Sequence, residues 1–130
     1  LNQSHLTFLN NFLLVVQTLL DNIYSGYEKK MIFISSRVGS IEQNTLGLMY
    51  SYRSSKTALN QVVKSLSIDL SDRNVCAVAL HPGWVSTDMG GPNALINVET
   101  SVSGMIAVIE NISQLDTGKF FNYDGSSIKW

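Results

Sequence analysis

The residues of this chain best suited to chemistry are a tyrosine and a lysine four positions apart, Tyr52 and Lys56. Residues with this spacing share one face of a helix, so the phenol and the ammonium would be neighbours. A fixed cation beside a phenol favours the phenolate, which makes such a pair suitable for general acid–base catalysis. Tyr50 is the competing phenol, but its offset of six from Lys56 places it off that face.

Two short apolar runs flank this pair, and each leads into residues with a possible function. Residues 31–35 are followed by Ser36 and, after two further residues, by Gly39. Residues 75–80 are followed by a histidine and then by residues 82–87, with the sequence PGWVST. Short apolar runs bounded by turn residues indicate buried strands, so both functional segments would follow the carboxyl end of a strand.

The remaining elements follow from the spacing of apolar residues. Apolar positions three and four apart predict helices over residues 5–26, 49–70 and 99–111, and a last strand is expected over residues 119–123. The apolar stripe of the first helix is wide, which predicts burial on two sides, against the sheet and against a partner. Helices that alternate with short strands imply an α/β fold with parallel strands.

Composition excludes several classes of function. With 130 residues, 45% of them hydrophobic and 15% charged, one ordered domain is expected. The net charge of −1 argues against nucleic acid and anionic membranes as partners. No apolar run reaches the ~18 residues of a membrane span. Cys76 is expected to be a buried core thiol, in keeping with a cytoplasmic protein, and the separation of His5 from His81 argues against a metal site.

The order of these motifs resembles the short-chain dehydrogenase/reductase family. Ser-x-x-Gly follows a strand, Tyr-x3-Lys lies on a helix, and Pro-Gly-x-Val-x-Thr follows another strand. The segments YRSSKTALN and HPGWVSTDMGG, and NYDG near the C-terminus, are most similar to the C-factor and sniffer-type carbonyl reductases of that family. The resemblance runs from about Met31 to Trp130 and implies a Rossmann-like parallel sheet flanked by helices.

The resemblance also implies that part of the domain is missing. A glycine-rich turn that holds a pyrophosphate would precede these motifs, and the sequence has none. We therefore interpret residues 1–130 as a single, partial domain that lacks the N-terminal glycine-rich half. The first residue, Leu1, is not a methionine, which suggests a piece of a longer product. The strand near Met31 should then have an open edge, so we expect the isolated chain to be marginally stable or to bind something there.

The resemblance implies catalytic roles for a tyrosine, a lysine, a serine and an asparagine. Tyr52 would give a proton to the carbonyl oxygen during reduction and remove it in the reverse reaction. Lys56 would favour the phenolate and hold ribose hydroxyls of the cofactor. Ser36, which precedes x-x-Gly as the family's serine does, would position the substrate oxygen; Ser35 is its rival, because successive strand residues point to opposite faces. Asn10 is the favoured candidate for a fourth, water-holding residue.

Other residues carry a binding or structural interpretation. By resemblance, nicotinamide would pack against the loop after the second strand, through Pro82, Gly83, Val85 and Thr87. Asn11 is an alternative to Asn10, and His81 is expected to be structural rather than catalytic. Trp84 would either line the substrate pocket or fill the core.

The implied function is reduction of a small carbonyl compound to an alcohol, or the reverse, with NADP or NAD as cofactor. The resemblance favours NADP, and the residues that choose between the two would lie in the missing half. An alternative is an inactive half-domain that acts as an association module. The helices over residues 5–26 and 49–70 would then pair the chain into a homo-oligomer. An epimerase or dehydratase that uses Tyr-x3-Lys ranks last, because little chain follows Lys56.

Overall fold

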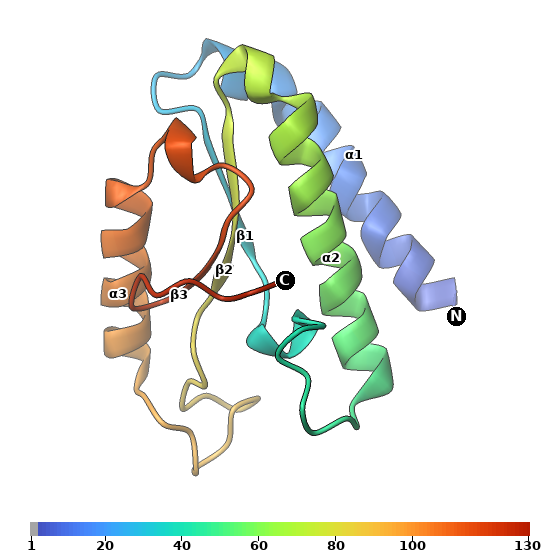
Figure 1. Cartoon of the computed structure of the whole chain (residues 1–130), viewed down its shortest axis with the longest axis vertical. Coiled ribbons are helices and arrows are strands. Elements are labelled where there is room, and N and C mark those ends of the chain that lie inside the picture. Colours follow the sequence, from blue (N-terminus) through green and yellow to red (C-terminus); the bar gives the residue numbers. More distant parts are fainter. Residues whose placement is uncertain (1–2) are drawn as a thin grey trace.

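The computed structural model describes residues 3–130, with side chains from residue 10 onward. Three helices and three strands alternate along the chain (Figure 1). In order they are α1 (Gln3–Ser25), β1 (Lys30–Ile34), α2 (Tyr50–Asp69), β2 (Cys76–His81), α3 (Val98–Asn111) and β3 (Phe120–Asn122). The expected helices and strands are thus confirmed, with ends that differ by one or two residues.

The three strands form one parallel sheet in the order β1-β2-β3. β1 pairs with β2 from Lys30 opposite Cys76 to Ile34 opposite Leu80. Helices α1 and α2 cover one face of this sheet and α3 covers the other (Figure 1). The predicted α/β fold with parallel strands is confirmed. Each strand ends at the same side of the sheet, so the loops that carry the candidate residues start there.

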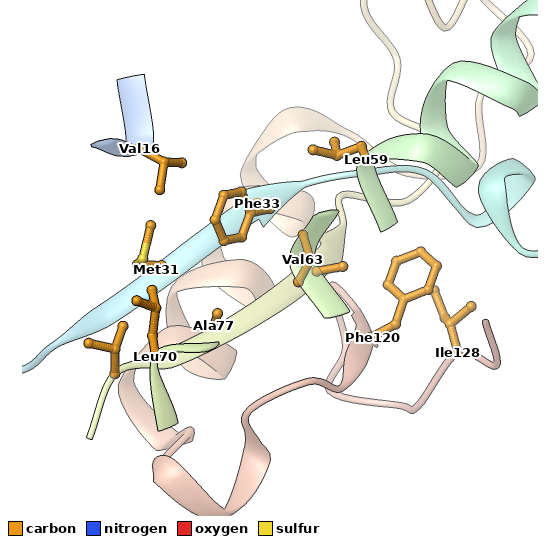
Figure 2. Close-up of a cluster of buried hydrophobic side chains, with 11 residues drawn as sticks. Val16, Met31, Phe33, Leu59, Val63, Leu70, Ala77, Phe120 and Ile128 are labelled. Carbon is orange, nitrogen blue, oxygen red and sulfur yellow. The ribbon is translucent and has the colours of Figure 1, made fainter. Parts of the chain in front are cut away.

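Alternation along the central strand β2 divides the core into two clusters. Ala77 and Ala79 face α1 and α2, where the larger cluster surrounds Val63, as Figure 2 shows. Val78 and Leu80 face α3 and the smaller cluster. All these side chains are fully buried, which explains why this strand reads as an unbroken apolar run rather than an alternating one.

One side of α1 is covered by the rest of the described chain and another is not. Val16 is buried against the sheet, with Phe12, Leu20 and Ile23 packed beside it. The large hydrophobic side chains of the same helix that remain exposed are Leu13, Leu14, Val15 and Leu19. Burial on two sides is therefore not seen within the described chain, and a partner on the second side stays a prediction.

The segment after β1 packs directly onto α2. Ser36 begins a 3-10 turn, Arg37–Gly39, and Gly39 lies so close to the helix that an added Cβ would sit 2.8 Å from Lys56 C and Cβ. Its φ lies outside the left-handed region, so glycine is needed here for space rather than for torsion. Thr57 Oγ1 donates to the Gly39 carbonyl at 2.8 Å, and Arg53 Nη1 donates to the Val38 carbonyl at 3.1 Å.

His81, the last residue of β2, is a half-buried base. Its Nδ1 is buried and has no hydrogen-bond partner among the described residues. Burial, and secondarily the charge of Arg37, lower the pKa of His81 to about 4. The imidazole is therefore neutral at physiological pH, and its structural role stays a prediction.

No helix in residues 3–130 combines the length and the apolar character needed to cross a membrane.

Replacing Gly39 by alanine should destabilise the chain by about 3 kcal/mol, because the new methyl group meets helix backbone that cannot move aside. Gly47→Ala is a matched control in the same loop. An added Cβ at Gly47 meets nothing within 4 Å, so only its φ of +66° is unfavourable, at about 1 kcal/mol. Urea unfolding measures both losses. Equal losses for the two variants would show that the close approach at Gly39 is unimportant.

The stability of the chain should fall as the pH is lowered from 6.5 to about 4. In this window unfolded His81 binds a proton that the folded state rejects, because its folded pKa lies below the ordinary value. After allowance for its partial exposure, we expect a loss of about 2 kcal/mol. The pKa values of Asp116 and Asp124 are held below 3.8 by hydrogen bonds, so their contribution is lost only at lower pH.

Urea unfolding of the wild type and of His81→Gln across this window measures the contribution. The variant should show a nearly flat dependence on pH. A variant as acid-sensitive as the wild type would assign the loss to other groups.

Candidate active site

Tyr52 and Lys56 lie side by side on the first two turns of α2. Lys56 Nζ is 5.9 Å from the centroid of the Tyr52 ring. Tyr52 is partly open to solvent, with 39% of the residue exposed. Tyr50 is 81% exposed. The helix thus brings together the phenol and the ammonium that the spacing of four indicated.

Lys56 also joins this helix to β1. Its Nζ donates a hydrogen bond to the carbonyl of Ile34, the last residue of the strand, at 3.3 Å. Desolvation by burial lowers the pKa of Lys56, because it penalises the ammonium form. The lysine therefore connects Tyr52 to the strand that leads into Ser36.

The two serines after β1 have different surroundings. Ser35 is buried on the α2 side, where its Oγ donates to Asn60 Oδ1 at 2.6 Å. Ser36 Oγ accepts a long hydrogen bond of 3.4 Å from the Val38 amide. Among the described residues the Ser36 hydroxyl only accepts, so its proton is available to another acceptor. The hydroxyl proton of Ser35 is already used.

The loop after β2 is folded back on itself. Gly83 has a φ of +87°, and a Cβ there would lie 2.6 Å from Ile96 Cδ1, so both torsion and space require glycine. Val85 forms a parallel bridge with Ile96, and the Trp84 indole donates to the Gly90 carbonyl at 2.7 Å. These contacts hold Pro82–Thr87 in one conformation next to the end of β2.

Thr87 and Trp84 both lie at the surface of this loop. Thr87 Oγ1 accepts from the Gly90 amide at 3.2 Å, and its residue borders an open hollow of about 400 Å³ with Ser86, Asp88, Gly91 and Pro92. Trp84 is 49% exposed and therefore does not fill the core. Of the two interpretations of Trp84, a place in the core is wrong.

Asn10 makes no direct hydrogen bond to this group of residues in the described chain, and its role stays a prediction. It lies on the exposed surface of α1, as does Asn11. In the described part of the chain no hydrogen bond joins either asparagine to the serine, the tyrosine or the lysine. A role for Asn10 thus has no support from the geometry and depends on the family resemblance.

The structure shows supporting residues that sequence reasoning missed. Ser101 of α3 is buried and donates to the Pro82 carbonyl at 2.6 Å, which anchors the loop after β2. Arg53 and Thr57 bind the turn after β1, as described above. Ser101 shares its helix with Ser103, so the sequence did not single it out, and nothing in the sequence marked Arg53 or Thr57.

Metal and thiol chemistry have no visible basis in the described residues. No group of three or more His, Cys, Asp and Glu side chains is gathered among the described side chains of residues 10–130 in a way that would hold an ion. Cys76 is buried in the central strand, and burial raises the pKa of its thiol to about 11. Such a thiol is a poor nucleophile at neutral pH.

Together these contacts gather a phenol, an ammonium and a serine hydroxyl around the start of α2 and the end of β1. The phenol can exchange a proton, the ammonium can stabilise the phenolate, and the serine can donate a hydrogen bond. The ordered loop after β2 lies beyond the end of the adjacent strand. This arrangement suits proton transfer to or from an oxygen atom of a bound small molecule.

Comparison with known proteins identifies the family. The family model described as "short chain dehydrogenase" matches residues 5–95. The C-signal protein of Myxococcus xanthus is 42% identical over 116 residues, which cover 89% of this chain and 70% of that protein. A dehydrogenase of Rhodococcus, described as acting on 1-hydroxy-2-glutathionyl-2-methyl-3-butene, is 40% identical over 105 residues, 46% of its length.

Solved carbonyl reductases have the same fold. The NADPH-bound carbonyl reductase from chicken fatty liver superposes with a TM-score of 0.83 at 37% identity, over 91% of this chain and 52% of that one. The carbonyl reductase Sniffer of D. melanogaster gives a TM-score of 0.76 at 48% identity, over 78% of this chain and 41% of that one. The chain thus spans about half the length of these enzymes. The extent of the family match and the shared fold show that the chain belongs to the short-chain dehydrogenase family of oxidoreductases.

Proposed function

We propose that this chain is the catalytic part of an enzyme that reduces a carbonyl to an alcohol, or oxidises the alcohol, with a nicotinamide nucleotide. The observation that carries the proposal is the Tyr52–Lys56 pair, with Lys56 bonded to the strand that leads into Ser36. The carbonyl reductases among the similar structures support a small carbonyl compound as the substrate.

In this proposal each of three side chains has a defined task. The Tyr52 hydroxyl gives its proton to the carbonyl oxygen, or as phenolate takes it from the alcohol. Lys56 stabilises that phenolate through its charge. Ser36 donates its free hydroxyl proton to the substrate oxygen and so fixes the distance to Tyr52. Asn10 would hold a water molecule in the proton path, on the strength of the family resemblance alone.

The residues present fit one end of the cofactor. Nicotinamide nucleotide, when bound, supplies or accepts the hydride. Lys56 uses one of its three N–H donors on Ile34, so two remain for ribose hydroxyls. Pro82, Gly83, Val85 and Thr87 would bind the nicotinamide from the loop after β2. NADP is favoured over NAD because the similar chicken enzyme is NADPH-bound.

We further infer that residues 1–130 are one part of a domain and that the pyrophosphate is held by residues outside this sequence. The chain covers about half of the similar solved enzymes, and it has no glycine-rich turn between a first strand and a helix. Activity is therefore proposed for the assembled domain. The cytoplasmic location of the protein remains a prediction.

A second candidate function is association, and the exposed apolar side of α1 favours it. Leu14 and Val15 are 58% and 57% exposed, and Leu13 and Leu19 lie beside them on the same helix. Such a surface on a half-length chain suits pairing with a second copy through α1 and α2. Titration of the assembled domain with NADPH and with NADH separates the two functions. Binding supports the enzyme, whereas a stable oligomer that binds neither nucleotide supports the association module.

Tyr52→Phe removes the proposed acid while keeping the ring beside Lys56. We expect carbonyl reduction to fall by ~10³-fold, because general acid–base catalysis contributes about that much, with the Kd for NADPH changed less than about threefold. Tyr50→Phe is the matched control and should keep full activity, since Tyr50 lies off the lysine face. Steady-state kinetics and cofactor fluorescence measure both. Unchanged turnover in Tyr52→Phe would refute the assignment.

Alanine at the two neighbouring serines should affect different properties: turnover at Ser36 and stability at Ser35. Ser36→Ala should lower kcat by ~10²-fold, the usual effect of losing one donor to the reacting oxygen, with little change in stability. Ser35→Ala leaves Asn60 Oδ1 without its donor and should lower the free energy of unfolding by about 1 kcal/mol, with kcat within about tenfold of the wild type. Kinetics and urea unfolding of both variants decide. If Ser35→Ala loses more turnover than Ser36→Ala, the serine has been assigned wrongly.

A further inference from the structure

We propose that Asn60 is a positioning residue that sets the place of Ser36 relative to Tyr52 and Lys56. This inference depends on the proposed function for its catalytic consequence. Asn60 follows Lys56 by four residues, as Lys56 follows Tyr52, so the three occupy successive turns along α2. It is 4% exposed, and its polar side chain is therefore buried between the helix and the end of β1.

The Asn60 amide bonds both sides of the candidate serine. Its Oδ1 accepts from Ser35 Oγ at 2.6 Å, immediately before Ser36. Its Nδ2 donates to the Gly39 carbonyl at 3.2 Å, at the end of the turn that Ser36 begins. One rigid amide thus ties the residue before Ser36 and the last residue of its turn to the helix that carries Tyr52.

The orientation of this amide follows from its partners. The Gly39 carbonyl can only accept a hydrogen bond, so the nitrogen of Asn60 must face it. The oxygen then faces the Ser35 hydroxyl, which is a donor. Both hydrogen bonds are buried, and each is costly to lose because water cannot replace it.

No other described side chain holds both sides of Ser36. Lys56 bonds the Ile34 carbonyl, before the serine. Arg53 and Thr57 bond the Val38 and Gly39 carbonyls, after it. The Ser36 hydroxyl itself has just one long hydrogen bond, within its own turn. Its place is therefore decided by the backbone on each side, and Asn60 is the side chain that joins those two segments.

The close packing of Gly39 against α2 limits how far the turn that begins at Ser36 can move. The position of an added Cβ at Gly39 lies 3.1 Å from Asn60 Nδ2, so the turn and the amide are in direct contact. Loss of the amide would allow the turn to shift away from α2. A shift of about 1 Å in a positioned group can lower turnover by ~10²-fold.

The first test is a double-mutant cycle between Asn60 and Ser36 in the NADPH-dependent reduction by the assembled domain. Asn60→Leu should lower kcat by 10- to 100-fold with the Kd for NADPH changed less than about threefold. Gln61→Leu is the matched control: the next residue, also an amide, exposed and bonded to Ser65 across the helix surface. It should keep wild-type kinetics.

The cycle separates positioning from general loss of structure. If Asn60 acts through Ser36, Asn60→Leu should lower kcat by less than about threefold in a Ser36→Ala background. An undiminished loss in that background would overturn the inference. Asn60→Asp keeps the acceptor for Ser35 and loses the donor to Gly39, so it provides a variant of nearly native shape if the leucine variant folds poorly.

Hydrogen exchange decides the inference independently of turnover. The amides of Gly39 and Ser40 donate to Ser36 and Arg37 carbonyls within the turn, at 2.8 Å and 3.0 Å. In Asn60→Asp and Asn60→Leu they should exchange at least about tenfold faster while amides in the middle of α2 keep their protection. Unchanged exchange would overturn the inference. An assembled wild-type domain that shows no turnover would end the proposed function and leave exchange as the deciding measurement.

Discussion

The close approach of the turn after β1 to helix α2 is the contact on which the candidate site depends. Gly39 lies against the backbone of Lys56, at a distance that no larger residue allows. This contact brings the end of β1, at Ile34, to the first turns of α2, which starts at Tyr50. Because of this contact, the helix that carries Tyr52 and Lys56 lies next to the turn that begins at Ser36. The contact itself is made by backbone and Cβ atoms and not by the proposed catalytic groups.

Hydrogen bonds from α2 then keep this contact in one geometry. Lys56, Arg53 and Thr57 donate to carbonyls on either side of Ser36, and Asn60 binds both sides. Each carbonyl so used lies outside the strand ladder and would otherwise need water or a neighbouring strand. The helix therefore satisfies the backbone of the turn and positions the candidate groups through the same contacts.

Two surfaces of the described chain remain open: the free edge of β1 and one side of α1. β1 is an edge of the described sheet, and α1 exposes a row of apolar side chains that includes Leu14. A parallel strand with an open edge is unfavourable, and an apolar helix face in water is a common site of association. Both features agree with a chain that spans about half the length of similar carbonyl reductases.

The sequence by itself determined the elements, their parallel order and the pairing of Tyr52 with Lys56. These depend on local periodicity and on a spacing of four along one helix, which need no knowledge of distant contacts. The tertiary structure alone decided which serine has a free proton, that Asn10 is exposed, and that Asn60 and Ser101 support the loops. The physical reason is that these properties depend on how closely two distant backbone segments approach and on which buried polar atom is left without another partner.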